Sequence, residues 1–171
     1  MRINIESVRK REAASSIGFD YAANSEEKET YRVLLGATSV DFVNVGGKIS
    51  QRNGLVAVDY AIEAGFAAEC ARCGRECSQS LVASGEKYLA DKSEEDEKDG
   101  EDFFVTETAG IFDTEDFAVE FLGLEVPYRY LCSEDCRGLC ENCGADLNEG
   151  ECSCPKKAKN PAFDILDDFF K

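Results

Sequence analysis

LVAVDYAIEAGFAAECA, residues 55–71, predicts a long β-strand that ends beside a cysteine. The segment is rich in Val, Ile, Tyr and Phe, and apolar residues alternate with polar ones along part of it, which is typical of a half-buried strand. Similar segments precede and follow it: RINIESV (2–8), TYRVLLGA (30–37), VDFVNVGGKIS (40–50) and QSLVASGEKYLA (79–90). Turns at Gly46-Gly47 and Asn53-Gly54 are expected to separate the strands. This part of the chain therefore predicts an antiparallel sheet with one solvated face.

An acidic segment separates these strands from a predicted helix. Residues 91–102, DKSEEDEKDGED, carry eight acidic and two basic side chains, so we expect a solvated loop. Asp113 or Thr114 can then cap a helix over about 114–124, and Pro127 lies just beyond its end. Apolar residues recur there at helical spacing, namely Phe117, Ala118, Phe121 and Leu122. We interpret them as core residues of a helix that covers the sheet.

These patterns define the predicted fold class. The 171 residues fit an α+β fold dominated by an antiparallel β-sheet that curls toward a barrel, with a covering helix and a cysteine-rich, zinc-binding C-terminal subdomain. We expect a strand-rich domain over residues 1–127 and a cysteine-rich tail over 128–171 packed on it. A chain of this size buries roughly 70% of its unfolded-state surface, so metal would organise one end of the fold rather than hold all of it together.

Charge limits the kind of partner. The chain has 35 acidic and 19 basic residues, a formal net charge of −16, and no histidine. Two four-thiolate zinc sites, each contributing +2 and −4, would take the total to about −20. A field of that sign repels phosphate backbones and membrane surfaces, and it suits a basic partner.

The first residues, MRINIESVRKREAASS, decide the expected compartment. They have scattered charge and no apolar run of the length that a secretory signal or a membrane span needs, so we expect a cytoplasmic protein without a membrane segment. Thiols stay reduced there, and nine cysteines is an odd number. A full disulfide framework is therefore disfavoured, and metal or redox chemistry becomes the leading use of the cysteines.

Four cysteine pairs carry the clearest chemical signal. Residues 70–74 (CARCG) and 140–144 (CENCG) share the form of a zinc knuckle, in which two thiolates bind one metal and the glycine permits a tight turn. The other pairs are Cys132 with Cys136 and Cys152 with Cys154. Four pairs are enough for two tetrahedral sites.

Spacing assigns the pairs to two structural Zn²⁺ sites. Residues 140–154 have the form C-x2-C-x8-C-x-C, so a local site can close there with little loop entropy. By elimination the two remaining pairs would meet and join the strand hairpin to the chain entering the tail. The predicted ligands are Cys140, Cys143, Cys152 and Cys154 in one site and Cys70, Cys73, Cys132 and Cys136 in the other. Cys77 is left over, as a small buried or incidental residue.

Other chemistry fits the sequence less well. An iron–sulfur cluster also takes four cysteines, but its common C-x2-C-x2-C run is absent. A thioredoxin-like CxxC needs a strand-to-helix setting, whereas Cys70 and Cys73 lie between two predicted strands. All-thiolate zinc leaves no open coordination position, and we find no Gly-rich phosphate loop or nucleophile elbow. We therefore expect no enzymatic activity; a zinc- or redox-sensing binding protein is the alternative function.

The C-terminal residues 156–171, KKAKNPAFDILDDFFK, predict a short helix. Asn160 can cap it and Pro161 can begin it. Its aromatic and aliphatic residues then fall on one side and its aspartates nearer the other. We expect this helix to dock on the core of the protein; a partner-binding tail is the alternative.

The stretch VPYRYLCSEDCRGLCENCGADLNEGECSC, residues 126–154, closely resembles the C-terminal part of the YceD family of bacterial and plastid large ribosomal RNA subunit accumulation proteins. The resemblance extends to AECARCGREC (68–77), to the acidic loop and helix, and to NPAFDIL (160–166), and covers roughly residues 55–170. It implies a non-enzymatic factor that large-subunit ribosomal RNA needs in order to accumulate. It also implies that the family's paired cysteines fall on the eight residues named above. The ending DDFFK departs from the basic ending expected of the family.

Charge and the implied role together suggest a partner. Seven basic residues could gather around the knuckles and contact RNA: Arg72, Arg75, Arg129, Arg137, Lys156, Lys157 and Lys159. Residues 125–160, however, carry seven acidic and five basic side chains. We therefore favour contact with a basic ribosomal protein or an assembly factor of the large subunit over direct RNA binding.

Overall fold

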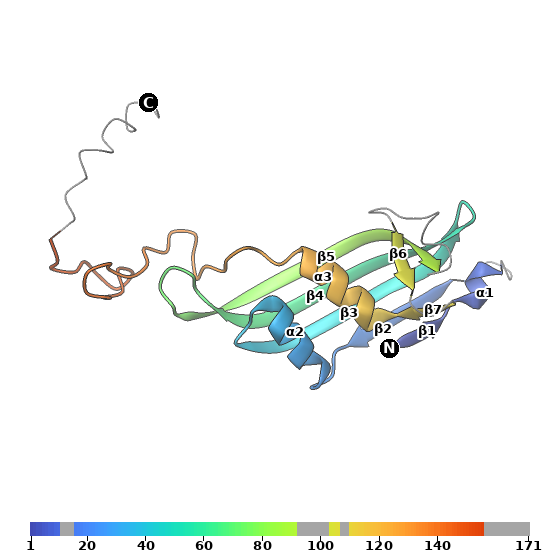
Figure 1. Cartoon of the computed structure of the whole chain (residues 1–171), viewed down its shortest axis with the longest axis horizontal. Coiled ribbons are helices and arrows are strands. Elements are labelled where there is room, and N and C mark those ends of the chain that lie inside the picture. The colour runs from blue at the N-terminus through green and yellow to red at the C-terminus, as the bar shows by residue number, and fades with distance from the viewer. Residues whose placement is uncertain (11–15, 92–102, 107–109, 156–171) are drawn as a thin grey trace, which may run out of the picture.

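A curled five-stranded sheet forms the body of the protein in the computed structural model, which describes residues 1–10, 16–91, 103–106 and 110–155 (Figure 1). The strand order is β2-β3-β4-β5-β6. The strands are β2 (Ile17–Ala22), β3 (Ser39–Arg52), β4 (Leu55–Glu69), β5 (Glu76–Asp91) and β6 (Phe103–Thr106). The predicted acidic loop, apart from Asp91, and the predicted helix within residues 156–171 lie outside the described residues.

The sheet is mixed, so the expectation of a mainly antiparallel sheet is wrong, although the α+β class is confirmed. Strands β2 to β5 are antiparallel, but β6 runs parallel to β5 from Tyr88↔Phe103 to Asp91↔Thr106. A parallel neighbour needs a crossover of about a dozen residues. Residues 92–102 lie between β5 and β6 in the chain, so their length allows this pairing, which strand periodicity does not reveal.

The predicted glycine turns have two different outcomes. Asn53 and Gly54 have φ of 51° and 88° and close the β3–β4 hairpin, as predicted. Gly46 and Gly47 instead lie inside β3 and do not form a turn. A Cβ at Gly47 would lie 2.6 Å from the ring of Phe19. The glycine therefore makes room for an aromatic ring on the inner face of the sheet.

TYRVLLGA is helical, so its prediction as a strand is wrong. Residues 30–35 of this segment form the C-terminal part of α2 (Glu27–Leu35), which begins upstream of the segment. The Asn24 side chain accepts a hydrogen bond from the Glu27 N–H, and the Glu27 carboxylate accepts one from the Asn24 N–H, which forms a capping box. Tyr31 and Leu35 are buried one turn apart, and Gly36 ends the helix with a left-handed φ of 58°.

The N-terminal segment RINIESV forms a strand only over its first residues. β1 (Arg2–Asn4) is followed by α1 (Glu6–Arg9). β1 pairs with β7 (Ile111–Asp113) in a separate two-stranded antiparallel sheet. This small sheet leads directly into the covering helix.

That helix, α3 (Thr114–Leu124), confirms the prediction over 114–124 (Figure 1). The Asp113 side chain accepts a hydrogen bond of 3.1 Å from the Glu115 N–H, so Asp113 is the cap. The four predicted core residues are buried: Phe117, Ala118, Phe121 and Leu122. Rings of Phe104 and Tyr60 lie 5.0 and 4.9 Å from that of Phe117. Burial of each such side chain stabilises the fold by about 1.5–3 kcal/mol.

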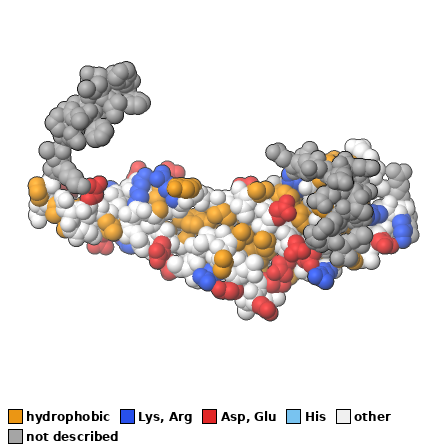
Figure 2. All heavy atoms as spheres, viewed as in Figure 1, with side chains coloured by type: hydrophobic (Ala, Val, Ile, Leu, Met, Phe, Trp, Pro, Cys, Tyr) orange, Lys and Arg blue, Asp and Glu red, His pale blue; other side chains and the backbone are white. Residues whose placement is uncertain are grey.

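The surface reflects the excess of acidic residues. Figure 2 shows acidic side chains gathered over the region of α2 and the start of α3, with few basic ones among them. No helix in the described part of the chain is long and apolar enough to cross a membrane.

Candidate metal centres

The first cysteine group, called the hairpin site below, joins two distant parts of the chain. Cys70 and Cys73 lie in the turn between β4 and β5, and Cys132 and Cys136 lie in the segment after α3. The four Sγ atoms all lie within 4.8 Å of one another. Cys70 Sγ is 3.7 Å from Cys136 Sγ, and Cys73 Sγ is 3.7 Å from Cys132 Sγ. All but Cys132 are buried, so little water reaches this group.

The second group, called the tail site, is local and more exposed. Its members are Cys140, Cys143, Cys152 and Cys154, whose Sγ atoms also lie within 4.8 Å of one another. Cys140 Sγ is 3.3 Å from Cys152 Sγ. Cys143 is exposed and the other three are half-buried. The structure thus groups the cysteines into the two sets that spacing predicts.

The sulfur spacing fits a metal cage and not a disulfide. A disulfide joins sulfurs at about 2.05 Å, whereas four sulfurs at about 2.3 Å from a tetrahedral zinc ion lie about 3.8 Å apart. The two hairpin-site distances of 3.7 Å match the second value. The 3.3 Å pair of the tail site is shorter but also lies well outside bonding distance. Both groups could hold a metal ion.

The two CxxCG turns have the same backbone geometry. The Gly74 N–H donates to the Cys70 carbonyl at 2.8 Å, and the Gly144 N–H donates to the Cys140 carbonyl at 2.8 Å. Both glycines have a left-handed φ, 71° and 73°. A residue with a Cβ is strained at such a φ, which explains why glycine follows the second cysteine of each turn.

Backbone donors give each group one acidic thiol. Burial raises the pKa of Cys70, but N–H groups of Cys132, Arg72 and Cys73 outweigh it and lower this pKa to about 6. N–H groups of Cys143 and Asn142 lower the pKa of the Cys140 thiol to about 6.

One other thiol in each group has a strongly raised pKa. The Cys136 side chain raises the pKa of Cys132 to about 12, and the Cys143 side chain raises that of Cys154 to about 12, both with a contribution from burial. A thiolate disfavours ionisation of a second thiol close to it, because the two negative charges repel each other. Each group therefore forms one thiolate readily and needs a cation before all four sulfurs can ionise.

The hairpin site is tied to the core of the sheet by Tyr130. Its backbone carbonyl accepts a 2.9 Å hydrogen bond from the Ala71 N–H in the CxxC turn. Its ring lies 5.3 Å from that of Phe66 on β4, and its hydroxyl donates to the Leu35 carbonyl at 2.9 Å. Arg72 also donates to the Cys136 carbonyl at 2.7 Å. The segment after α3 is therefore held on the β4–β5 end of the sheet.

Asn148 connects the two sites. It lies in the tail-site loop, and its Nδ2 donates to Cys136 Sγ of the hairpin site at 3.5 Å. Its Oδ1 accepts a 2.8 Å bond from the Arg137 N–H. In the same loop Asp146 forms a 3.1 Å ion pair with Arg75, next to the first knuckle. The sequence gives no signal for this contact, because no spacing rule relates a residue of one loop to a sulfur of the other site.

Three arginines of the predicted basic cluster contact other residues of the protein, whereas Arg129 is exposed. Arg75 pairs with Asp146 at 3.1 Å and Glu149 at 3.8 Å, and Arg137 lies 3.8 Å from Glu151. Arg72 donates to two backbone carbonyls of the segment after α3. The three lysines of the predicted cluster lie outside the described residues. Arg72, Arg75 and Arg137 therefore contribute to the protein's own contacts.

Cys77 is half-buried and belongs to neither group. It packs against the hairpin site, donates to the Ala68 carbonyl at 3.4 Å and accepts a 3.1 Å bond from the Gln79 amide. The Gln79 amide also donates to the Leu131 carbonyl at 3.1 Å. Cys77 thus contributes to packing beside the site.

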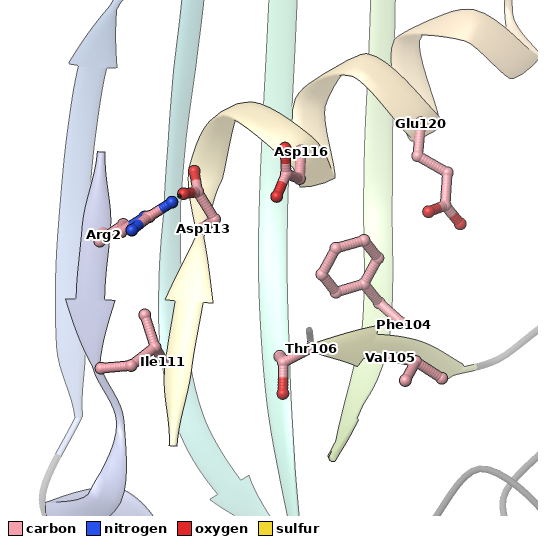
Figure 3. A pocket seen from close by; sticks show the side chains of 8 residues that line it. All are labelled: Arg2, Phe104, Val105, Thr106, Ile111, Asp113, Asp116 and Glu120. Carbon is pink, nitrogen blue, oxygen red and sulfur yellow. Dashed lines mark hydrogen bonds and ion pairs between the residues drawn. The ribbon is translucent and has the colours of Figure 1, made fainter. Parts of the chain in front are cut away.

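One cavity of about 380 Å³ lies between β6, β7 and α3 (Figure 3). Three carboxylates line it, but Asp113 is bound to Arg2 at 2.9 Å and also caps α3. Burial raises the pKa of Glu120, which projects from the same helix. The only hydroxyl among the lining residues belongs to Thr106, and it donates to the Ala90 carbonyl at 3.2 Å.

The fold and the two cysteine groups define a small α+β protein with two sites able to hold metal. Residues 58–170 match the model of a family described as large ribosomal RNA subunit accumulation protein YceD. The chain belongs to the YceD family.

Individual relatives agree with this assignment. A chloroplastic YCED homolog 1 of Arabidopsis thaliana, named as a large ribosomal RNA subunit accumulation protein, is 23% identical over 124 aligned residues, which cover 57% of this chain and 39% of the relative. An uncharacterized protein of Mycobacterium tuberculosis is 33% identical over 93 residues, which cover 54% of this chain and 45% of the relative. The chain spans less than half the length of these relatives. No solved structure matches it.

Proposed function

We propose that this chain is a non-enzymatic factor that supports the accumulation of large-subunit ribosomal RNA, and that it holds two structural Zn²⁺ ions. Family membership supports the role. The observation that carries the metal assignment is the hairpin site, where four mostly buried sulfurs from segments about sixty residues apart lie at tetrahedral spacing. The ligands are the eight cysteines of the two sites.

Zinc suits these sites better than an iron–sulfur cluster. Both sites consist of cysteine pairs, and the two pairs that share the CxxCG turn have the backbone geometry of zinc knuckles. Four thiolates leave the metal no open position for substrate or water, so its role is structural. In the hairpin site it would join the strand-rich part, residues 1–127, to the cysteine-rich tail, 128–171.

The proposed partner is a basic protein of the large ribosomal subunit or one of its assembly factors, met in the cytoplasm. The net charge of −16 opposes contact with a phosphate backbone. The arginines nearest the two sites are paired with carboxylates or bonded to carbonyls of the chain itself. These observations favour a protein partner over direct RNA binding.

A zinc- or redox-sensing role is the second candidate. The observation that favours it is the exposure of Cys143 beside Cys140, whose pKa is lowered to about 6. An accessible group with thiolate character is open to oxidation. The two functions differ in outcome, because a sensor loses its metal under mild oxidation whereas a structural site retains it.

Metal content and cellular rescue together test the proposal. Elemental analysis of protein purified without added metal should find two zinc ions per chain, and mild peroxide should leave both in place. In cells that lack the gene, the wild-type chain should restore the ratio of large- to small-subunit ribosomal RNA, and Cys70→Ser should not. Cys77→Ser is the matched control, because Cys77 belongs to neither site. Rescue by metal-free variants, or no change in the ratio on deletion, would overturn it.

A further inference from the structure

Strand β5 has a long edge that no other strand covers within the described part of the chain. It pairs with β4 from Glu76 to Leu89, whereas β6 pairs only with Tyr88–Asp91 (Figure 1). Over Glu76–Glu86, no described residue pairs with the other side of β5. A row of backbone N–H and C=O groups therefore points away from the sheet along this part of the strand.

The usual protections of a sheet edge are missing from this stretch. Residues Cys77–Gly85, CSQSLVASG, contain no charged residue and no proline, in a chain of which 32% is charged. The β4–β5 register is continuous and has no bulge. Val82 is 56% exposed. By contrast, the opposite edge strand β2 has only six residues and carries the exposed Asp20. Proteins normally blunt a long edge with charge, proline or a bulge, because an open edge recruits other strands.

We propose that the outer edge of β5 between Glu76 and Glu86 binds an extended basic segment of a protein partner, which adds to the sheet as a further strand. The proposal rests on the proposed function only in taking the partner to be a basic protein. Strand addition supplies affinity through backbone hydrogen bonds and specificity through alternate side chains.

The charge distribution selects this occupant over a second copy of the chain. Two copies would each bring a net charge of −16 to the interface. The uncharged stretch is bounded by Glu76, which accepts a hydrogen bond from the Thr38 hydroxyl, and by Glu86, which pairs with Arg52. Glu63 and Glu69 lie exposed on the neighbouring β4. Lys or Arg at the ends of an incoming strand would lie near these carboxylates, and an apolar residue at its centre would lie near Val82.

The edge itself can be examined first by residue-resolved amide hydrogen exchange on the full chain. Successive N–H groups of a strand point to opposite sides, so alternate amides of Glu76–Glu86 should exchange quickly and the intervening ones, bonded to β4, slowly. The probe is the peptide Lys-Val-Lys-Val-Val-Val-Lys-Val-Lys, with two controls: one with two valines replaced by proline and one with every lysine replaced by glutamate. The basic peptide should slow hydrogen exchange of the outward amides, and each control peptide should bind at least about tenfold more weakly.

Proline substitution provides a second test. Ser84 and Gly85 are adjacent and exposed, so their N–H groups point to opposite sides of β5. Proline has no N–H, so at one of the two positions it removes a donor on the outer edge, and at the other it removes a hydrogen bond to β4. Whichever of Ser84→Pro and Gly85→Pro retains the thermal unfolding of wild type has lost only the outward N–H, and we call it the edge-blocked variant. This variant should lose binding of the basic peptide. Ser84→Ala keeps the N–H and should bind like wild type. If neither proline variant folds, the exchange experiment decides alone.

The outcomes separate this proposal from the proposed function. Wild type and the edge-blocked variant are each mixed with purified large-subunit proteins and, separately, with large-subunit ribosomal RNA. Loss of protein binding in the edge-blocked variant supports strand addition. Equal protein binding by both, or equal binding of the proline-containing peptide, overturns strand addition and leaves a protein partner in place. Binding of RNA without protein overturns strand addition and the proposed protein partner, and leaves the role in ribosomal RNA accumulation in place.

Discussion

Asn148 Nδ2 lies 3.5 Å from Cys136 Sγ, so the loop of the tail site donates a hydrogen bond to a sulfur of the hairpin site. The same amide accepts a bond from the Arg137 N–H and donates to Asp146, which pairs with Arg75 beside the first knuckle. Hydrogen bonds to a metal-bound thiolate stabilise its charge. We therefore expect closure of the tail-site loop to favour metal binding in the hairpin site.

Asn148→Ala should weaken zinc binding in the hairpin site by about 10- to 100-fold, the usual effect of losing a hydrogen-bond partner of a ligand. Competition with a chromophoric chelator measures the two zinc affinities separately. Asn142→Ala is the control, since the Asn142 side chain bonds to the Pro155 carbonyl at 3.4 Å and to no other described residue, and alanine keeps the backbone N–H that faces Cys140. Equal affinities in the two variants would show that the Asn148 contact contributes nothing to the hairpin site.

Cys143→Ser should remove the tail-site metal and also lower the hairpin-site affinity, because the loop that carries Asn148 would lose its closure. By linkage the two sites then bind metal cooperatively. Amide exchange should show the sheet still protected in Cys143→Ser, whereas Cys70→Ser should expose the β4–β5 turn. Unchanged hairpin-site affinity in Cys143→Ser would mean that the two sites are independent.

Zinc release should depend on pH in a defined direction. In the metal-free chain the pKa values of Cys70 and Cys140 fall from 9.0 to about 6, so the stability contributed by these thiolates is complete above pH 9 and is lost as the pH falls to about 6. Metal must also displace protons from Cys132 and Cys154, so affinity rises with pH. Bound zinc should leave only below about pH 6, as followed by elemental analysis after dialysis. Full retention at about pH 4 would contradict this.

Gly47→Ala should destabilise the sheet by about 1–3 kcal/mol, because a Cβ there would lie 2.4 Å from the Asp59 carbonyl and 2.6 Å from the Phe19 ring. Its neighbour is a matched control: a Cβ at Gly46 meets only the Phe19 carbonyl, at an ordinary 3.8 Å. Urea unfolding of the two variants measures the difference. Equal unfolding midpoints would show that the ring of Phe19 can move aside without loss.

Local patterns predicted the elements that local interactions stabilise. The alternation in residues 55–71 predicted β4, the Asn53-Gly54 pair predicted its hairpin, and the cap at Asp113 with apolar residues at helical spacing predicted α3. The strand predicted at residues 30–37 is wrong because the signal that decides this segment lies upstream. The capping box of Asn24 and Glu27 begins α2, and the burial of Tyr31 and Leu35 fixes its inner face.

The sequence by itself determined the tail site, since its four cysteines lie within fifteen residues and a short loop closes at little entropic cost. It also determined the CxxCG turns, because a left-handed φ selects glycine. The tertiary structure alone decided how β6 joins the sheet, which sulfur Asn148 reaches, and where the described residues leave β5 unpaired. The first two relationships join segments that are distant in the chain, and the third depends on the absence of a neighbouring strand among the described residues. Neither produces a periodicity or a residue spacing that can be recognised in the sequence.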